Sequence, residues 1–161
     1  FALPASGASV VTLQIGFAND QYRDVLVPIG LSAGSASGLE LPLLAESTWQ
    51  SLKNAVGVAE PPGSASIAAY IVQGQNAVSG AEVVVPPAGT TAIPLFDGAG
   101  PNDWIFGAST GLAGAVIMLG VPTSQASVGF QIAVDAEIQS VSGVPVAPST
   151  LTFVTVARPS T

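Results

Sequence analysis

The stretch VGFQIAVDAEIQ, Val128–Gln139, carries the strongest structural signal in the chain. Apolar side chains stand at every second position from Val128 to Ile138 and alternate with small or polar ones. A period of two is that of a β-strand with one face turned toward an apolar core. The sequence therefore predicts a single strand of 12 residues here, which is longer than the usual strand length of about five or six residues.

Shorter segments of the same kind lie on its N-terminal and C-terminal sides. Strands are expected over residues 11–17, 25–29, 67–72, 77–85, 91–96, 104–106, 112–121 and 151–156. Pro28 indicates an edge or a bulge, and Ile67–Val72 is apolar on both faces, as in a central strand. Turn residues recur at intervals of roughly 8–15 residues, which is typical of a sandwich or barrel.

One short helix is expected around residues 47–56. Ser47 and Gln50 have the spacing of a capping box with Ser47 as the N-cap, and Gly57 would end the helix. The buried face would consist of Trp49, Leu52 and Val56. Together these elements predict an all-β fold, an antiparallel β-sandwich or jelly roll of about eight strands, in a single domain over residues 1–161.

The chemistry of the chain is limited by its composition. Its 161 residues include no His, no Cys and only three cations, Arg23, Lys53 and Arg158, and its net charge is -7. The usual general base, metal ligand and thiol nucleophile are therefore absent. We expect a protein that is not an enzyme and that carries no cofactor.

The same composition restricts the partners. Three scattered cations cannot neutralise a row of phosphates, so no direct contact with nucleic acid is expected. The longest apolar stretch, Gly111–Pro122, is too short for a membrane-spanning helix of about 20 residues. Only 8% of the residues are charged and 48% are hydrophobic. This composition suggests that part of the protein surface is apolar and is buried against a partner, for which another copy of the protein is the simplest candidate. The alternative is a large core with a neutral surface.

In fold and composition the chain resembles small single-jelly-roll capsid proteins of tailless icosahedral viruses, or shell decoration proteins. The resemblance rests on the Ser-, Gly- and Pro-rich loops and on neutral, Ala- and Val-rich strands such as Val128–Gln139. It implies a self-assembling structural protein in the virion, in contact with copies of itself or another shell protein and not with the genome. No small-molecule ligand is expected. The segments expected to reach neighbours are Phe1–Ser9, Ser32–Gly38 and Pro145–Thr161.

Carbohydrate binding is the alternative function. A secreted, lectin-like β-sandwich module would stack sugars on an exposed aromatic side chain. Trp104 lies beside the polar loop Asp97–Asp103 and is the candidate for this role. The protein would then be extracellular and not part of a virion.

Acidic residues suggest three further kinds of site. Asp97, Asn102 and Asp103 share one Gly-rich loop and are candidate calcium ligands. Asp135 and Glu137 are spaced as a carboxylate pair of a glycosidase could be. Leu95–Ala99 with the later Ile117–Gly120 resembles the retropepsin pattern, which would make Asp97 the catalytic residue of an aspartic protease. The hydroxyl residue that follows the aspartate in that family is replaced by Gly98.

Overall fold

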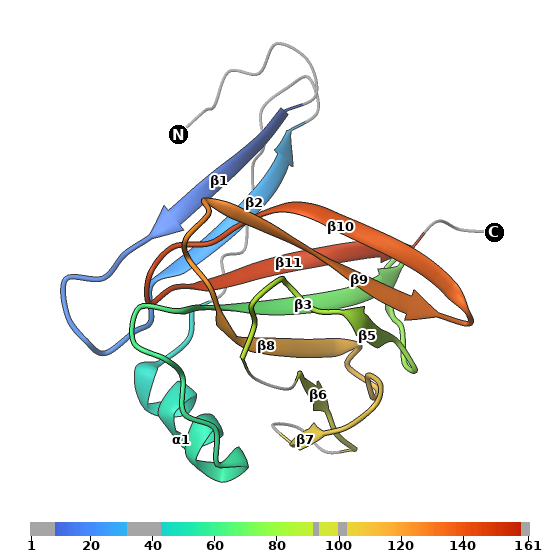
Figure 1. Ribbon diagram of the computed structural model, residues 1–161, viewed down its shortest axis with the longest axis horizontal. Helices are drawn as coiled ribbons and strands as arrows, with labels where there is room; N and C mark the ends of the chain where they lie inside the picture. The colour runs from blue at the N-terminus through green and yellow to red at the C-terminus, as the bar shows by residue number, and fades with distance from the viewer. Residues whose placement is uncertain (1–8, 32–42, 92–93, 100–102, 159–161) are drawn as a thin grey trace.

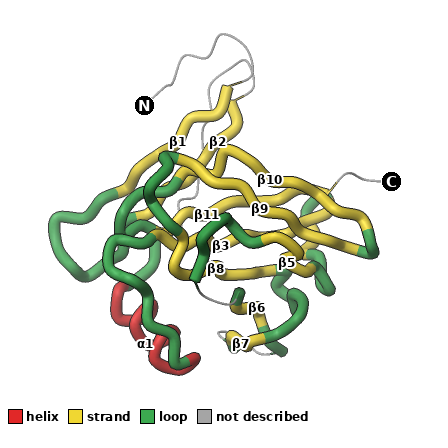
Figure 2. Tube along the Cα trace, in the orientation of Figure 1, coloured by secondary structure: helices red, strands yellow, loops and turns green. Residues whose placement is uncertain are grey.

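Two β-sheets and one helix account for the regular structure of residues 9–31, 43–91, 94–99 and 103–158, the part that the computed structural model describes. The prediction of a mostly β protein with one short helix is confirmed. Figures 1 and 2 show the small sheet lying across the large one, with the helix below them at the lower left. The elements in chain order are β1 (Ser9–Ile15), β2 (Val25–Leu31), α1 (Glu46–Val56), β3 (Ala65–Gln73), β4 (Asn76–Ala77), β5 (Glu82–Val85), β6 (Leu95–Asp97), β7 (Trp104–Phe106), β8 (Ala115–Val121), β9 (Ser127–Val134), β10 (Glu137–Pro145) and β11 (Leu151–Arg158).

The large sheet has the strand order β1-β2-β11-β3-β8-β6-β7, with β4 paired to β3, and the small sheet has the order β10-β9-β5. β11 runs parallel to both of its neighbours, β2 and β3, so the large sheet is mixed and the expectation of a purely antiparallel sandwich is wrong. The reason is the chain between β2 and β3, which includes α1. Such a crossover returns the chain in the same direction, and the C-terminal strand then fills the place between the two.

Apolar side chains cover both faces of the large sheet. One face packs against the small sheet through residues such as Ile67, Met118 and Ile132, all of them buried. The other face packs against α1, where Trp49 is buried and Leu52 and Val56 are half-buried. The predicted helix face is therefore confirmed, and so is the central position of β3, which lies between β11 and β8.

The stretch Val128–Gln139 forms a hairpin and not the single strand that its alternation predicts. β9 ends at Val134, and β10 begins at Glu137. Asp135 and Ala136 both have positive φ values, 49° and 68°, as in a two-residue type I′ turn. Such a turn lets the alternation of small and apolar side chains continue in the sequence while the chain reverses direction.

The structure corrects two smaller predictions. Helix α1 begins at Glu46 after Ala45, without a side-chain cap, so Ser47 is not the N-cap; Gly57 does end the helix in the left-handed conformation. Segment 77–85 is divided between β4 in the large sheet and β5 in the small one. Most of Pro145–Thr161 lies in the large sheet, where β11 pairs with β3 along its whole length; its contact with neighbours stays a prediction. Residues 1–8 and 32–38, expected to reach neighbours, lie outside the described part.

Candidate interaction surface

The most unusual surface belongs to the ribbon, the pair of strands β1 and β2. They pair without a register shift over seven residues each, from Ser9 opposite Leu31 to Ile15 opposite Val25. Only Val25 and Leu26 of β2 also pair with β11, so the rest of the ribbon extends past the sheet, as Figure 1 shows. Of the two alternatives predicted at Pro28, the bulge is absent, and among the described strands only β1 pairs with this residue.

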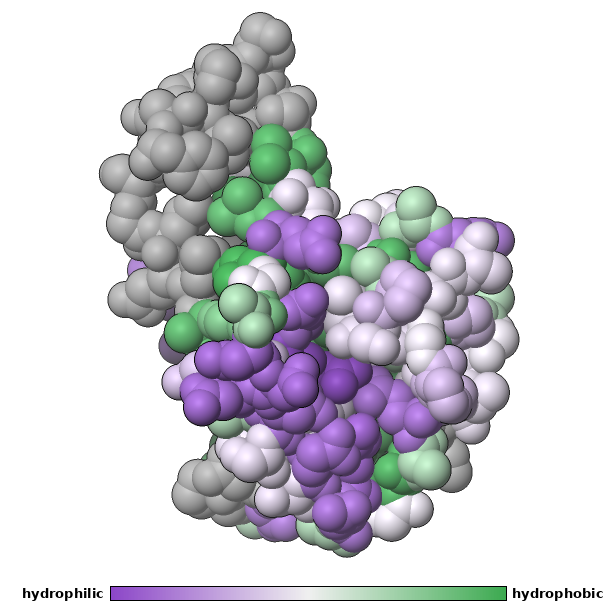
Figure 3. Space-filling model, turned by 90° about the vertical axis from the view of Figure 1, so that its left-hand side faces the viewer, coloured by the Kyte–Doolittle hydropathy of each residue, from purple (hydrophilic) through white to green (hydrophobic). Residues whose placement is uncertain are grey.

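The ribbon has no charged side chain and is poorly covered. The sequences of the two strands, SVVTLQI and VLVPIGL, contain no ionisable residue. Val10 is 73% exposed, and Val11 and Leu13 are half-buried. Figure 3 shows hydrophobic surface gathered in the upper part of the molecule, where Figure 1 places the ribbon, above a largely hydrophilic surface. Exposed apolar surface of this kind marks an interaction site.

The backbone of β1 has hydrogen-bonding groups directed away from the sheet. The N–H of Leu151 in β11 donates to the carbonyl of Asp24, directly before β2, at 3.0 Å. Since alternate residues of a strand point to opposite neighbours, even-numbered residues of β2 face β11 and odd-numbered ones face β1. The even-numbered residues of β1, namely Val10, Thr12 and Gln14, therefore turn their N–H and C=O groups toward the free edge.

A groove opens where β2 and β11 diverge. Its volume is about 570 Å³, and its wall is formed by the ribbon while its floor comes from β3 and β11. The rings of Tyr70 and Phe153 stack there with centroids 6.4 Å apart. Burial raises the pKa of the Tyr70 hydroxyl above its ordinary value of 10.0. The groove is lined by Val10, Val27, Pro28, Gly30, Tyr70, Phe153, Val154 and Thr155.

The base of the ribbon, in contrast, is held by a buried polar cluster around Glu60. The Glu60 carboxylate accepts hydrogen bonds from Arg23 Nη2 at 2.8 Å, Lys53 Nζ at 3.2 Å and Trp49 Nε1 at 3.3 Å, and also from the Ser66 hydroxyl. The guanidinium of Arg23 lies 4.8 Å from the centre of the Trp49 ring, which adds a cation–π contact. We call these five residues the Glu60 cluster.

The cluster shifts the titration of its carboxylate. Burial by itself would raise the pKa of Glu60, but the Ser66 hydrogen bond, the charge of Arg23 and the Trp49 and Lys53 donors outweigh it and lower the pKa below 4.5. Glu60 is therefore ionised at neutral pH and pairs with two of the three cations of the chain. Sequence inspection missed this role, since Glu60 precedes Pro61-Pro62-Gly63 and resembles an ordinary turn residue.

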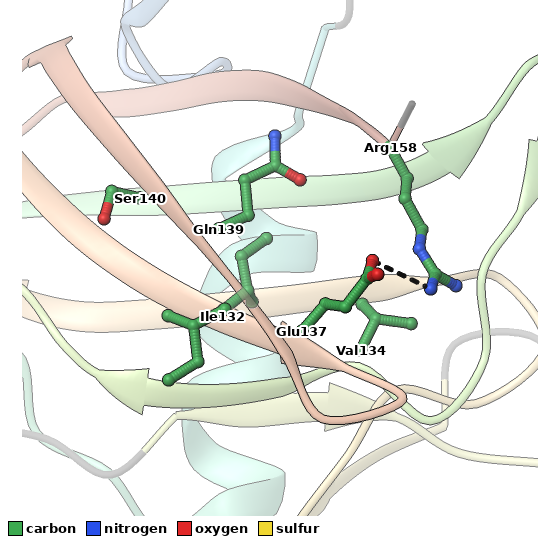
Figure 4. Close-up of a pocket in the computed structure, with 7 residues that line it drawn as sticks. Ile132, Val134, Glu137, Gln139, Ser140 and Arg158 are labelled. Carbon is green, nitrogen blue, oxygen red and sulfur yellow. Dashed lines mark hydrogen bonds and ion pairs between the residues drawn. The ribbon is translucent and has the colours of Figure 1, made fainter. Parts of the chain in front are cut away.

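The third cation holds the hairpin that joins β9 and β10. Arg158 Nη1 lies 2.9 Å from Asp135 Oδ2, and Nη2 lies 3.3 Å from Glu137 Oε2. Figure 4 shows Arg158 and Glu137 facing each other across one end of a groove of about 560 Å³. In the same region Gln139 Nε2 donates to the carbonyl of Ala157 in β11. Asp135 and Glu137, considered as a glycosidase pair, are thus joined by a cation that fastens the small sheet to the large one.

Asp97 has a structural role that its loop position did not suggest. It is buried at the end of β6, and its carboxylate accepts the backbone N–H groups of Gly111, Ala113 and Ala115 at 2.7–2.9 Å. Both of its oxygens are therefore engaged by the chain itself. Asp103 is exposed, and Asn102 lies outside the described residues. The calcium and aspartic-protease hypotheses stay untested; within the described residues no three acidic side chains gather as metal ligands.

Trp104, the candidate for sugar stacking, lies in β7 with its side chain partly buried against the helix-side core. The neighbouring Ile105 and Phe106 are 45% and 52% exposed. Part of the indole face is thus used for packing, and the sugar-binding hypothesis stays a prediction.

Comparison with known proteins does not assign the chain to a family. No protein-family model matches it, and no curated protein matches its sequence. Among the described residues, no helix has the length and apolarity required to cross a membrane. The functional argument therefore depends on the surfaces of the molecule itself.

Proposed function

We propose that this protein is a structural protein that assembles with copies of itself, as a shell or decoration subunit of a virus capsid. The observation that carries the proposal is the uncharged ribbon, which extends from the sheet with apolar side chains only partly covered. Removing such a surface from water gains the hydrophobic contribution without stripping water from charges.

The placement of the charges supports the same proposal. Arg23, Lys53 and Arg158 are all paired with carboxylates of their own chain. Each cation is thus committed to holding the subunit together, which leaves none to bind the phosphates of a genome. A subunit of this kind fits the outer part of a virion, next to its own copies or another shell protein.

Light scattering at several protein concentrations tests the proposal. The weight-average mass should rise with concentration, and electron microscopy of the assembled fraction should show closed, symmetric particles. Because the chain carries a net charge of -7, added salt should strengthen the association by screening repulsion between subunits. A mass that stays at 15.9 kDa at every concentration would overturn the proposal. Amorphous aggregates would contradict a shell.

A further inference from the structure

The four outer strands of the two sheets differ in how they are protected against pairing with another chain. Proteins protect exposed edges with very short strands, bulges, prolines or charges. In the large sheet, β7 has only three residues. In the small sheet, β5 is interrupted by a register shift between Val83 and Val85 and is followed by Pro86-Pro87. β10 has a shift between Val141 and Val144, with Gly143 at a φ of 68°.

None of these protections is present on β1. Its seven residues contain no charge, no Pro and no Gly, and they pair with β2 without a bulge. Within the described part of the chain, no strand lies on its other side. The N–H and C=O groups of Val10, Thr12 and Gln14 point to that side, as derived above from the pairing of Asp24 with Leu151. β1 is thus a straight strand with an open set of donors and acceptors.

We infer that β1 pairs antiparallel with β1 of a second copy of this chain, with the two-fold axis at Thr12. This inference rests on the proposed self-assembly and specifies the contact that produces it. Thr12 is the middle residue of β1, so an antiparallel pair centred on it brings all seven residues of each strand into register. A closed two-fold contact uses the same surface on both copies.

In this register, backbone hydrogen bonds and apolar side-chain contacts form between the two copies at the same time. Thr12 lies opposite Thr12 of the second copy, and Val10 lies opposite Gln14, so every outward N–H finds a carbonyl. Three pairs with two bonds each give about six hydrogen bonds across the contact. On one face, Val11 lies opposite Leu13, so the half-buried apolar stripes of the two ribbons become continuous. A register shifted by one residue would place Val11 opposite Thr12 and interrupt both patterns.

A pair of substitutions at the centre of the strand tests the inference. Thr12→Pro removes the outward N–H while leaving the hydrogen bonds between β1 and β2 in place, since the Thr12 N–H does not face β2. Thr12→Val keeps that N–H and is the matched control. Thr12→Pro should weaken association on the order of thirtyfold, through the loss of one net hydrogen bond per copy. Thr12→Val should weaken it less than about threefold. Light scattering measures both.

The outcomes separate this inference from the proposed function. If the wild type assembles and Thr12→Pro assembles equally well, self-assembly stands and β1 pairing is overturned. If the wild type is a monomer throughout, both are overturned. Should Thr12→Pro fail to fold, hydrogen exchange on the wild type decides. The amides of Val10, Thr12 and Gln14 should become protected as concentration rises, and exchange that stays fast at all concentrations would refute the pairing.

Discussion

The two ends of β2 differ in how they are held to the rest of the subunit. The Glu60 cluster holds its beginning with two buried ion pairs and a cation–π contact. Its other end lies in the part of the ribbon beyond β11, where no side chain is charged and the apolar side chains are only partly covered. The scarce charges of this chain are thus used inside the subunit, where they join distant segments. The neutral surface that remains is suited to contacts between subunits.

The largest effect is expected from Glu60→Ala, which removes the acid at the base of the ribbon. The side chain of Glu60 is only 7% exposed, and its loss leaves Lys53 without its partner and Arg23 with only its longer contact to Glu46, at 3.7 Å. Breaking a buried ion pair in this way costs about 3–5 kcal/mol of unfolding free energy. Urea denaturation measures the loss. Glu82→Ala, at an exposed acid of β5, is the control and should cost less than about 0.5 kcal/mol. Equal losses of unfolding free energy in the two variants would contradict a special stabilising role of the Glu60 cluster.

The next effect concerns Asp97, a buried carboxylate that bonds to backbone and not to cations. Asp97→Ala leaves the N–H groups of Gly111, Ala113 and Ala115 without their acceptor, and we expect a loss of about 2–4 kcal/mol. Asp97→Asn keeps one acceptor oxygen and should lose less. A loss below about 0.5 kcal/mol in the alanine variant would show that the carboxylate does not brace this loop.

Melting of the same Asp97 variants with and without calcium examines the calcium hypothesis. A ligand that binds only the folded state raises its melting temperature. The structural role of Asp97 predicts no calcium-dependent rise in the wild type, because both carboxylate oxygens already accept backbone hydrogen bonds. A rise in the wild type that disappears in Asp97→Asn would assign the loop to calcium binding instead.

Acid should weaken the Glu60 cluster, next to the start of β2, before it affects the uncharged strands of the ribbon. The pKa of Glu60 is lowered in the folded state from an ordinary value of 4.5, so its stabilising contribution is complete above that value. The contribution is lost as the pH falls through the lowered pKa of the folded state. Unfolding free energies of the wild type and Glu60→Gln should therefore differ at pH 7 and converge in acid. Curves that run parallel from pH 7 into acid would mean that ionised Glu60 does not stabilise the fold.

The sequence predicts local elements better than it predicts their partners. The strands of the core and the helix with its Gly57 end follow from periods of two and of 3.6, which are local properties. The parallel position of β11 and the gathering of Arg23, Lys53 and Glu60 depend on pairings across the whole chain. No local pattern encodes them.

The hairpin of Val128–Gln139 shows why even a strong pattern can mislead. Val134 and Glu137 lie opposite each other on the same face, so the inward positions change from even to odd numbers at the turn. Ile138, expected to be inside, is consequently 65% exposed. A two-residue turn changes whether even-numbered or odd-numbered residues face the core, and the alternation of the sequence alone does not show this change.

The smallest effect on stability, and the sharpest contrast with Glu60→Ala, is expected from the ribbon. Changing Val11 and Leu13 together to Thr keeps good strand formers and removes apolar surface that is only half-buried. The unfolding free energy of the monomer should fall by about 1–2 kcal/mol, less than in Glu60→Ala, because part of that surface stays exposed within one subunit. Association should nevertheless weaken strongly, since the same side chains meet those of the second copy. If the double variant unfolded as easily as Glu60→Ala, the ribbon would belong to the core of the subunit, and its open surface would no longer argue for assembly.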